Sequence, residues 1–565
     1  MYDKEKLAQI KLSQQKWEEE NAREFEKELK KEFTSESGIP IKRIYTPLDL
    51  EGKGFDYLED VGFPGQYPCT RGDTPTMYRS GLWPMSQIVG HATLKETNAI
   101  YKRLIADGLR AIVIARDMAG QHGYDPGHPK AAGEVGRMGV SVSSLRDFEI
   151  LMDGINLGEV LISYFGNALA TVNIAEHLVL AEKQGIAWKD TQGYLQNDIL
   201  KEYSARGAYI FPPEPSIRLI VDSLEFCAHH APKYSPLAVC SYHQAEKGAT
   251  PVHEIAFMLS NLIVYLQAAV DRGLDIDFIA PRIRLHTFFS HIDFFEQVAK
   301  FRATRRLWAK IMKDRFKAKN SESMTCHILP LQAGTSVYKE QYLNNIARSA
   351  IAILGCAMIG GRRNEPRTYD EQFGISTEES LRTALRVQQI VGYETGVCDT
   401  IDPLAGSYFV EYLTSELEER ITKEIETIDN MGGALKAIEQ GYIQRTLAKD
   451  GYEKAKALLE GKTVRVGVNR FRSDGEEERP TTIYRADPRY EEKCIAELEK
   501  LRRERDNQRV TKALDNIKAV AGKKASAENN LMPFIVEAVK AYTTRGEIAD
   551  VLREVWGEYP EPAIF

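Results

Sequence analysis

Short apolar segments alternate with longer amphipathic ones between about residues 84 and 361 of this chain. Alternation of this kind is typical of βα units, whose parallel strands are buried on both faces. The pattern predicts strands at residues 85–91, 110–116, 160–165, 193–196, 237–243, 283–289, 325–331 and 357–361. The helices predicted between them include residues 171–184, 216–230, 251–272, 294–316 and 339–354.

Eight strands with eight following helices predict an α/β fold, a (β/α)8 TIM barrel. A doubly wound open sheet is the competing fold, but no GxGxxG motif follows any predicted strand. The barrel is therefore favoured.

The barrel pattern is flanked by charged helical segments. We predict four regions: an N-terminal helical arm (1–40), the substrate-binding barrel (41–395), a post-barrel helical region (396–480) and a C-terminal helical docking segment (481–565). Helices are expected at 415–431, 433–449, 451–460, 491–521 and 531–562. Ser415 and Glu418 have the spacing of a capping box for the first of these.

Composition narrows the class of protein. The net charge of −7 over 565 residues does not favour binding to nucleic acid or to an anionic membrane. No apolar run approaches the ~20 residues of a membrane span, and the N-terminus has no apolar signal-peptide core. The seven cysteines are scattered without metal-site spacing, which predicts reduced thiols and a cytoplasmic location.

Polar residues accumulate where the predicted strands end. Because carboxyl ends of parallel strands meet at one rim of a barrel, these residues predict a binding site there. The segment LAVCSYHQAE, residues 237–246, ends in a Tyr-His pair that can donate to a developing oxyanion or stage a proton. The alternative is that the pair only caps a strand. No zinc-site spacing, P-loop or GxSxG motif accompanies it.

Several longer motifs carry a resemblance. They are CTRGDTPTMYRS, GYDPGHP, LQNDILKEYSARGAYIFPPEPSIRLI, SYHQAEKGAT, IAPRIR and FFEQVAKFRATRRLWAKIM. Together they resemble the large subunit of the coenzyme-B12-dependent acyl-CoA mutases, which include the methylmalonyl-CoA, isobutyryl-CoA and 2-hydroxyisobutyryl-CoA mutases. The resemblance covers most of residues 35–470 and implies a TIM barrel and a radical 1,2-rearrangement of an acyl-CoA or related acid.

The resemblance also implies a cofactor and a partner. The cobalamin-binding motif DxHxxG is absent from this sequence. The chain therefore resembles the split mutases, in which adenosylcobalamin is carried mainly by a separate small subunit of the DxHxxG type. A heterotetramer is the expected assembly.

Site residues follow from the matching motifs. The resemblance implies that His243 holds the thioester carbonyl, and that Tyr242, Gln196 and Ile88 are its neighbours in the active site. The substrate-binding residues that it implies are Thr76, Met77, Ser163, Tyr194, Arg206, Arg282 and Arg284. The implied cofactor-binding residues are Gln121, His122, Glu246, Gly334 and Glu371.

Two departures from the family bear on the substrate. Methylmalonyl-CoA mutases have a tyrosine where this chain has Ile88, and hydroxyacyl mutases share the isoleucine. Yet those mutases have a glutamine where this chain keeps Arg206, whose guanidinium fork suits a carboxylate. The combination predicts a carboxylate-bearing substrate other than methylmalonyl-CoA. A 2-hydroxyacyl-CoA mutase is the alternative.

Other departures concern the channel that carries the pantetheine chain in the family. Large residues stand at its usually small positions, namely Tyr164, Phe165, Tyr194 and Arg284, and two family arginines are replaced by Gly81 and Ser86. The acyl carrier is then bound differently, the substrate is not a CoA thioester, or the chain is a catalytically silent scaffold. Retention of Tyr242, His243, Glu246 and Glu371 favours an enzyme.

Overall fold

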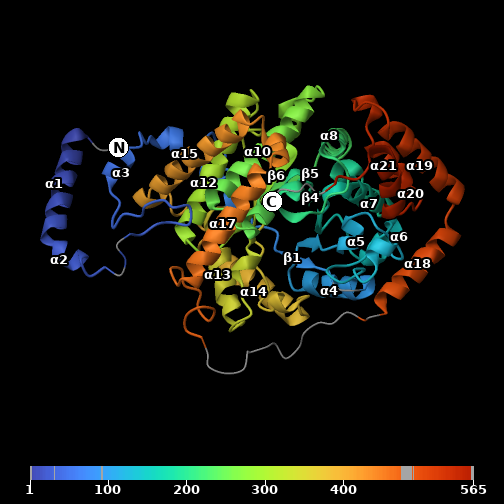
Figure 1. Ribbon diagram of the computed structural model, residues 1–565, viewed down its shortest axis with the longest axis horizontal. Coiled ribbons are helices and arrows are strands. Elements are labelled where there is room, and N and C mark those ends of the chain that lie inside the picture. Colours follow the sequence, from blue (N-terminus) through green and yellow to red (C-terminus); the bar gives the residue numbers. More distant parts are fainter. Residues whose placement is uncertain are drawn as a thin grey trace.

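The computed structural model describes residues 3–28, 30, 32–90, 93–472, 487 and 489–560. An α/β barrel occupies the centre of the molecule (Figure 1). The N-terminal helices α1 (Lys4–Glu20) and α2 (Ala22–Phe25) extend to one side of it, and the last four helices cover the opposite side. The boundary predicted at residue 480 lies outside the described residues.

The sheet has seven parallel strands arranged in chain order, each paired with the next. Such an order with helical crossovers is the arrangement of a TIM-type barrel, so the predicted fold class is confirmed. The strands are β1 (Ser86–Val89), β2 (Ala111–Ile114), β3 (Leu161–Phe165), β4 (Gly193–Gln196), β5 (Tyr234–Cys240), β6 (Ile283–Phe289) and β7 (Ile328–Gln332).

The predicted eighth strand at residues 357–361 is wrong. Its first two residues end α13, and Gly360 reverses the chain with a φ of 67°. Residues 362–367 take the eighth position instead, because Arg362 N–H donates to the Ile328 carbonyl and Glu365 forms a single parallel bridge with Leu331. A short apolar run next to two glycines fits a helix end as well as a strand, and length alone did not separate them.

Helices on the outside of the barrel follow the strands as predicted. They are α4 (Leu94–Ala106), α6 (Leu145–Leu151), α7 (Ala170–Lys183), α8 (Pro213–His230), α10 (Pro251–Asp271), α12 (Phe294–Lys310), α13 (Asn344–Met358) and α14 (Glu378–Glu394). Shorter helices are α3 (Pro47–Glu51), α5 (Met118–Gln121), α9 (Tyr242–Glu246) and α11 (Ile276–Ile279). Helix α10 is long and apolar enough to cross a membrane, but 78% of its apolar window is buried, which identifies it as a core helix.

The later helices correct three boundaries. Helix α15 begins at Tyr408 with Ser407 as its cap, so the capping box predicted at Ser415 is wrong. Helix α17 continues through Gly451, because that glycine allows close contact with Gly248 rather than ending a helix. The helices after the barrel are α15 (Tyr408–Asn430), α16 (Ala434–Glu439), α17 (Tyr442–Leu459), α18 (Tyr490–Glu504), α19 (Asn507–Ala521), α20 (Met532–Lys540) and α21 (Arg545–Trp556). Residues 491–521 form two helices instead of one, since Asp506 caps α19.

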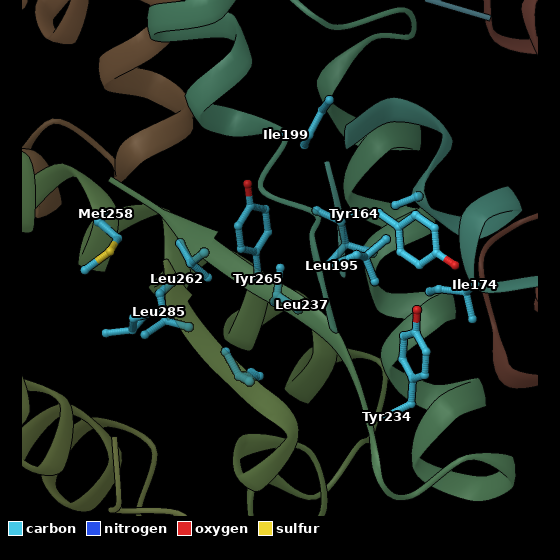
Figure 2. Packing of buried hydrophobic residues seen from close by; sticks show 14 of the residues in the cluster. Tyr164, Ile174, Leu195, Ile199, Tyr234, Leu237, Met258, Leu262, Tyr265 and Leu285 are labelled. Atoms are coloured by element: carbon cyan, nitrogen blue, oxygen red, sulfur yellow. The ribbon is translucent and has the colours of Figure 1, made fainter. Parts of the chain in front are cut away.

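Apolar side chains hold the strands against their helices. Leu237 and Leu285 on neighbouring strands pack with Met258 and Leu262 of α10 (Figure 2). Tyr265 of the same helix donates its hydroxyl proton to the Asp198 carboxylate at 2.6 Å. This packing fixes the chain at the carboxyl end of β4, where the site residues begin.

Candidate active site

Tyr242 joins the carboxyl ends of two strands. The predicted strand at 237–243 ends three residues early, so Tyr242 and His243 lie on helix α9 instead of β5. The Tyr242 hydroxyl accepts hydrogen bonds from the backbone N–H of Gly334 (2.9 Å), just after β7, and from the Arg367 guanidinium. Burial raises the pKa of Tyr242 well above its usual value, although Arg367 opposes the shift. The phenol is therefore neutral.

Glu246 lies on the same helix and binds the same turn. Its carboxylate accepts hydrogen bonds from the backbone N–H groups of Gly334 (2.5 Å) and Thr335 (3.0 Å). The gap above Gly334 is narrow, since a Cβ there would lie 3.1 Å from the Tyr242 hydroxyl. Glycine thus lets helix α9 approach the turn that follows β7.

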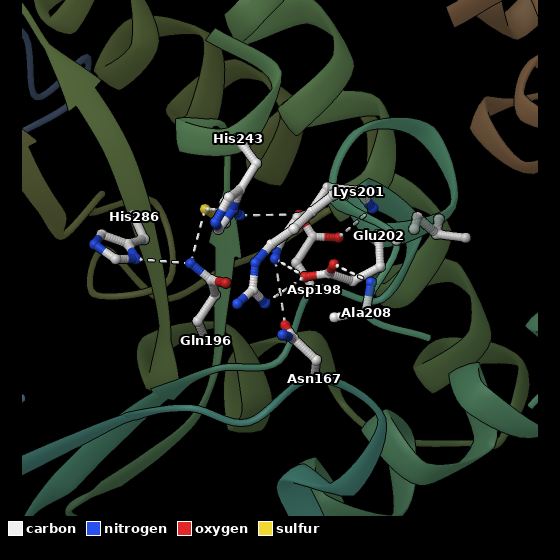
Figure 3. Close-up of polar contacts among 12 residues, drawn as sticks. Asn167, Gln196, Asp198, Lys201, Glu202, Ala208, His243 and His286 are labelled. Atoms are coloured by element: carbon white, nitrogen blue, oxygen red, sulfur yellow. Dashed lines mark hydrogen bonds and ion pairs between the residues drawn. The ribbon is translucent and has the colours of Figure 1, made fainter. Parts of the chain in front are cut away.

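Two histidines and a glutamine meet where β4, β5 and β6 end (Figure 3). Gln196 Nε2 donates to the Cys240 thiol (2.9 Å) and lies 3.1 Å from His286 Nδ1, and His243 Nδ1 lies 3.9 Å from the same thiol. Gln196 Oε1 is buried without a partner among the described residues. Burial, with nearby cations such as Lys201, lowers the pKa of both histidines well below the usual value. Each is a neutral imidazole that can donate to a carbonyl oxygen.

A cationic pair lies beside His243. Lys201 is fully buried, and its ammonium contacts the Glu202 carboxylate and Asn167 Oδ1 (3.3 Å) (Figure 3). Arg206 Nη1 is 3.6 Å from the same carboxylate and makes no hydrogen bond to a described residue. Two cations therefore share the Glu202 carboxylate, with the Asp198 carboxylate also close to Lys201, and the open Nη1 of Arg206 suits an anionic ligand.

A small cavity separates Ile88 from Glu371. Its volume is about 150 Å³, and its lining includes Gln87, Ile88, Arg367 and Glu371. Arg367 Nη1 is 3.4 Å from Glu371 Oε1. Burial raises the pKa of Glu371, against the lowering effect of Arg367. Gln87 Nε2 is buried without a partner among the described residues.

Gln121 and His122 lie on another part of the rim, at the end of α5. Gln121 Nε2 donates to the Arg116 carbonyl (2.7 Å), and its Oε1 is buried without a partner among the described residues. His122 Nε2 lies 3.3 Å from the Gly207 carbonyl oxygen, directly after Arg206. His122 is therefore linked to the backbone next to Arg206, which the sequence predicts to bind the substrate.

Four predicted substrate residues lie at the opposite end of the barrel. Arg282 and Arg284 line a cavity of about 300 Å³ beside the first residues of β5, with Lys233. Burial lowers the pKa of Arg284 to about 10, which leaves it cationic at neutral pH. Met77 packs against Gly360. Thr76 Oγ1 contacts Ser80 Oγ at 2.8 Å, on the exposed side of the same segment.

Ser163 and Tyr194 lie in the barrel interior, between the two ends. They are paired in the β3–β4 register, and the Arg363 guanidinium stands 5.7 Å from the centre of the Tyr194 ring. Arg363 forms an ion pair with Glu365, which also accepts a hydrogen bond from Ser86 Oγ (3.1 Å). Side chains from opposite walls of the barrel thus fill its interior at this level.

The structure separates the predicted residues into distinct places. The rim groups of β4 to β7 come together, while Gln121 and His122 lie near β2, and Arg282 and Arg284 lie at the other end of the barrel. Sequence reasoning missed five residues that complete these groups: Lys201, Glu202, Cys240, Arg363 and Arg367. Lys201 and Glu202 lie in the LQNDILKEY motif and Cys240 lies in LAVCSYHQAE, so the sequence could have indicated them. Arg363 and Arg367 belong to no motif or spacing that would have indicated them. Asp117 and Asp198, two further carboxylates near strand ends, each accept backbone hydrogen bonds as caps.

Known proteins give an independent comparison. The large subunit of 2-hydroxyisobutanoyl-CoA mutase from Aquincola tertiaricarbonis is 40% identical over 561 residues, 99% of this chain and 98% of that protein. Methylmalonyl-CoA mutase from Rhizobium meliloti is 36% identical, with 92% of this chain and 72% of the relative covered. The human mitochondrial methylmalonyl-CoA mutase is 34% identical over 92% of this chain and 68% of the relative. The sequence profile of the methylmalonyl-CoA mutase family matches residues 34–558. On this evidence the chain belongs to the methylmalonyl-CoA mutase family of coenzyme-B12-dependent isomerases.

Proposed function

We propose that this chain is the large subunit of an adenosylcobalamin-dependent mutase that rearranges the carbon skeleton of a carboxylate-bearing acyl-CoA other than methylmalonyl-CoA. The observation that carries the proposal is Arg206 near His243: it shares the Glu202 carboxylate with Lys201, and its Nη1 makes no hydrogen bond to a described residue. A guanidinium with unused donors in a largely buried place favours a planar anion such as a carboxylate.

The neutral side chains of the rim suit the other end of the acyl group. His243, with its lowered pKa, would donate a hydrogen bond to the thioester carbonyl without protonating it. Gln196 Oε1 is an open acceptor beside it. Tyr242 is held by Gly334 and Arg367, so its ring forms a fixed wall against which a reactive substrate can be kept still.

The rim also fits the cofactor. Gln87 Nε2 and Gln121 Oε1 are buried without partners among the described residues, and they suit the amide side chains around a corrin ring. Ile88, Glu246, Gly334 and Glu371 would complete that face. When bound, adenosylcobalamin supplies the carbon-centred radical chemistry that no side chain can provide.

A separate small subunit of the DxHxxG type is proposed as the carrier of the cobalamin, in a heterotetramer. The relative from Aquincola tertiaricarbonis, which is named a large subunit and matches over its whole length, supports a two-subunit enzyme. A cytoplasmic location agrees with seven free cysteines among the described residues. Size-exclusion chromatography of the chain with and without a cobalamin-loaded small subunit tests the assembly.

The substrate is tested with the reconstituted holoenzyme and a panel of thioesters. Ethylmalonyl-CoA and methylmalonyl-CoA carry a carboxylate, and isobutyryl-CoA and 2-hydroxyisobutyryl-CoA do not. We expect turnover of a carboxylate-bearing member to fall by about 10²–10³-fold in Arg206→Gln, since removal of one partner of a desolvated charge pair has an effect of that order. Unimpaired turnover by Arg206→Gln would refute the assignment.

A second candidate is a 2-hydroxyacyl-CoA mutase. Ile88 in the rim cavity and the 40% identity to the Aquincola tertiaricarbonis large subunit favour it. In that case 2-hydroxyisobutyryl-CoA is the preferred member of the panel and Arg206→Gln has little effect. The filled interior around Tyr194 and Arg363 favours a third outcome, in which free acids are turned over and thioesters are not.

A further inference from the structure

The last helix and the residues after it lie against two loops of the carboxyl rim. One loop, residues 122–124, follows Gln121, and the other, residues 207–211, follows Arg206. Arg553 of helix α21 contacts the first loop and Tyr559, just after it, contacts the second, although both come from the far end of the sequence. The C-terminal clamp, defined here as Arg553, Glu558 and Tyr559, makes these contacts.

Arg553 binds the first loop through its backbone. Its guanidinium donates to the carbonyl oxygens of His122 (2.5 Å) and Gly123 (3.0 Å) and lies 4.4 Å from the centre of the Tyr124 ring. Glu558 completes the contact, since it pairs with Arg553 (2.8 Å) and accepts a hydrogen bond from the Tyr124 hydroxyl (3.2 Å). One cation thus fixes two consecutive carbonyl groups, an arrangement that specifies the backbone path of the loop.

Tyr559 binds the second loop. Its backbone N–H donates to the Ile210 carbonyl at 2.9 Å, and its ring packs edge-on against Tyr203 (4.9 Å between centres) and Tyr209 (5.5 Å). Tyr203 lies on the single π-helical turn that ends at Arg206. The ring of Tyr559 therefore contacts one residue before Arg206 in the chain and one residue after it.

The two loops also contact each other under the clamp. His122 Nε2 lies 3.3 Å from the Gly207 carbonyl oxygen. Gly123 has a φ of 67°, and a Cβ on it would lie 2.5 Å from the Ala549 methyl group of α21. Helix and loop therefore approach as closely as a glycine permits. Movement of α21 would be transmitted to both loops.

We propose that Arg553 and Tyr559 are positioning residues for the reaction: they hold the loop of Gln121 and the loop of Arg206 at one fixed separation across the rim. The inference rests on the proposed function, because it assigns Arg206 to the substrate and Gln121 to the cofactor. Neither Arg553 nor Tyr559 is placed in contact with the reacting atoms. Their effect is on the geometry in which the substrate carboxylate is held.

The first test measures amide hydrogen exchange in the full chain. Tyr559→Ala removes the ring contacts, Tyr559→Phe keeps them, and Glu554→Gln alters an exposed ion pair of the same helix with Lys518. We expect exchange in residues 203–211 to rise at least tenfold in Tyr559→Ala and to stay unchanged in the other two variants. Unchanged exchange in Tyr559→Ala would overturn the proposal, whatever the substrate is.

The second test measures kinetics of the holoenzyme with the panel member of highest turnover. We expect KM to rise about tenfold in Tyr559→Ala and in Arg553→Ala, with kcat reduced by less than threefold and with Tyr559→Phe restoring wild-type KM. In the double variant with Arg206→Gln, the added effect of Tyr559→Ala should disappear, since both act on the same contact. Equal effects in the two backgrounds would overturn the positioning role, whereas an inert Arg206→Gln alone would overturn the proposed function and leave the exchange result standing.

Discussion

The carboxyl rim and the interior of the barrel differ in which of their buried polar groups are paired. At the rim, Gln196 and Gln121 each keep one polar atom without a partner among the described residues, and His243 is neutral. In the interior, Arg363 pairs with Glu365, which in turn binds Ser86 of β1. The rim leaves atoms of neutral side chains open, whereas the interior pairs its charges with each other, although Arg363 Nη1 and the Tyr194 hydroxyl there also lack a partner among the described residues.

The largest expected effect is in the interior, from Arg363→Ala. The change leaves the Glu365 carboxylate buried without its cation, which should lower the free energy of unfolding by about 3–5 kcal/mol. Urea unfolding followed by circular dichroism measures the change. The exposed pair of Arg103 and Glu378 is the control, and Arg103→Ala should unfold within error of the wild type. Equal free energies of unfolding for the two variants would contradict the prediction that the Arg363–Glu365 pair stabilises the fold.

The next largest effect is at the rim, from His243→Ala. Loss of one donor to the substrate carbonyl should lower kcat by about 10²–10³-fold, while the unfolding midpoint changes little because the imidazole makes one weak polar contact, at 3.9 Å with the Cys240 thiol, beside its edge-on packing with Tyr242. Steady-state kinetics of the holoenzyme and a thermal unfolding curve measure the two quantities. A variant with normal kcat would remove His243 from the site. The exposed His230→Ala provides the matched control.

A third prediction concerns acid. The pKa of His286 lies well below its ordinary 6.5 because of burial and the Arg363 and Lys201 charges. As pH falls below 6.5 the unfolded chain takes up this proton first, so stability is present above pH 6.5 and is lost on acidification. His286→Gln should reduce the slope of unfolding free energy against pH between 6.5 and 5, by up to about 1.4 kcal/mol per pH unit. Parallel curves for variant and wild type would disprove it.

The smallest expected effect is from Cys240→Ser. A hydroxyl can still accept the hydrogen bond from Gln196 and contact His243, so kcat should remain within about threefold of the wild type, or 0.6 kcal/mol. Cys240→Val, which fills the space without an acceptor, is the contrasting variant and should lose more. If the serine variant lost activity as strongly as the valine variant, the thiol itself would be required.

Much of the barrel was predictable because its strands are buried on both faces and its helices on one. Burial therefore gives the strands short apolar runs and the helices apolar residues at helical spacing, and these patterns located the seven strands. The error at 357–361 arose where a helix end and a strand have the same short apolar signature. The helix end predicted near Gly451 was wrong for a related reason. A glycine often ends a helix, but this one lies inside α17 and allows close contact with Gly248.

The sequence by itself determined the alternation of strands and helices, the family motifs and the residue types that gather at the rim. Only the tertiary structure decided which of them meet. Gln196 meets His286 of another strand, Arg367 binds the Tyr242 hydroxyl, and Arg363 stands 5.7 Å from the centre of the Tyr194 ring, all through contacts between chain segments far apart. The physical reason is that periodicity records burial, a local property, whereas a pairing of charges depends on the distance between side chains in the folded barrel, which no spacing along the chain records.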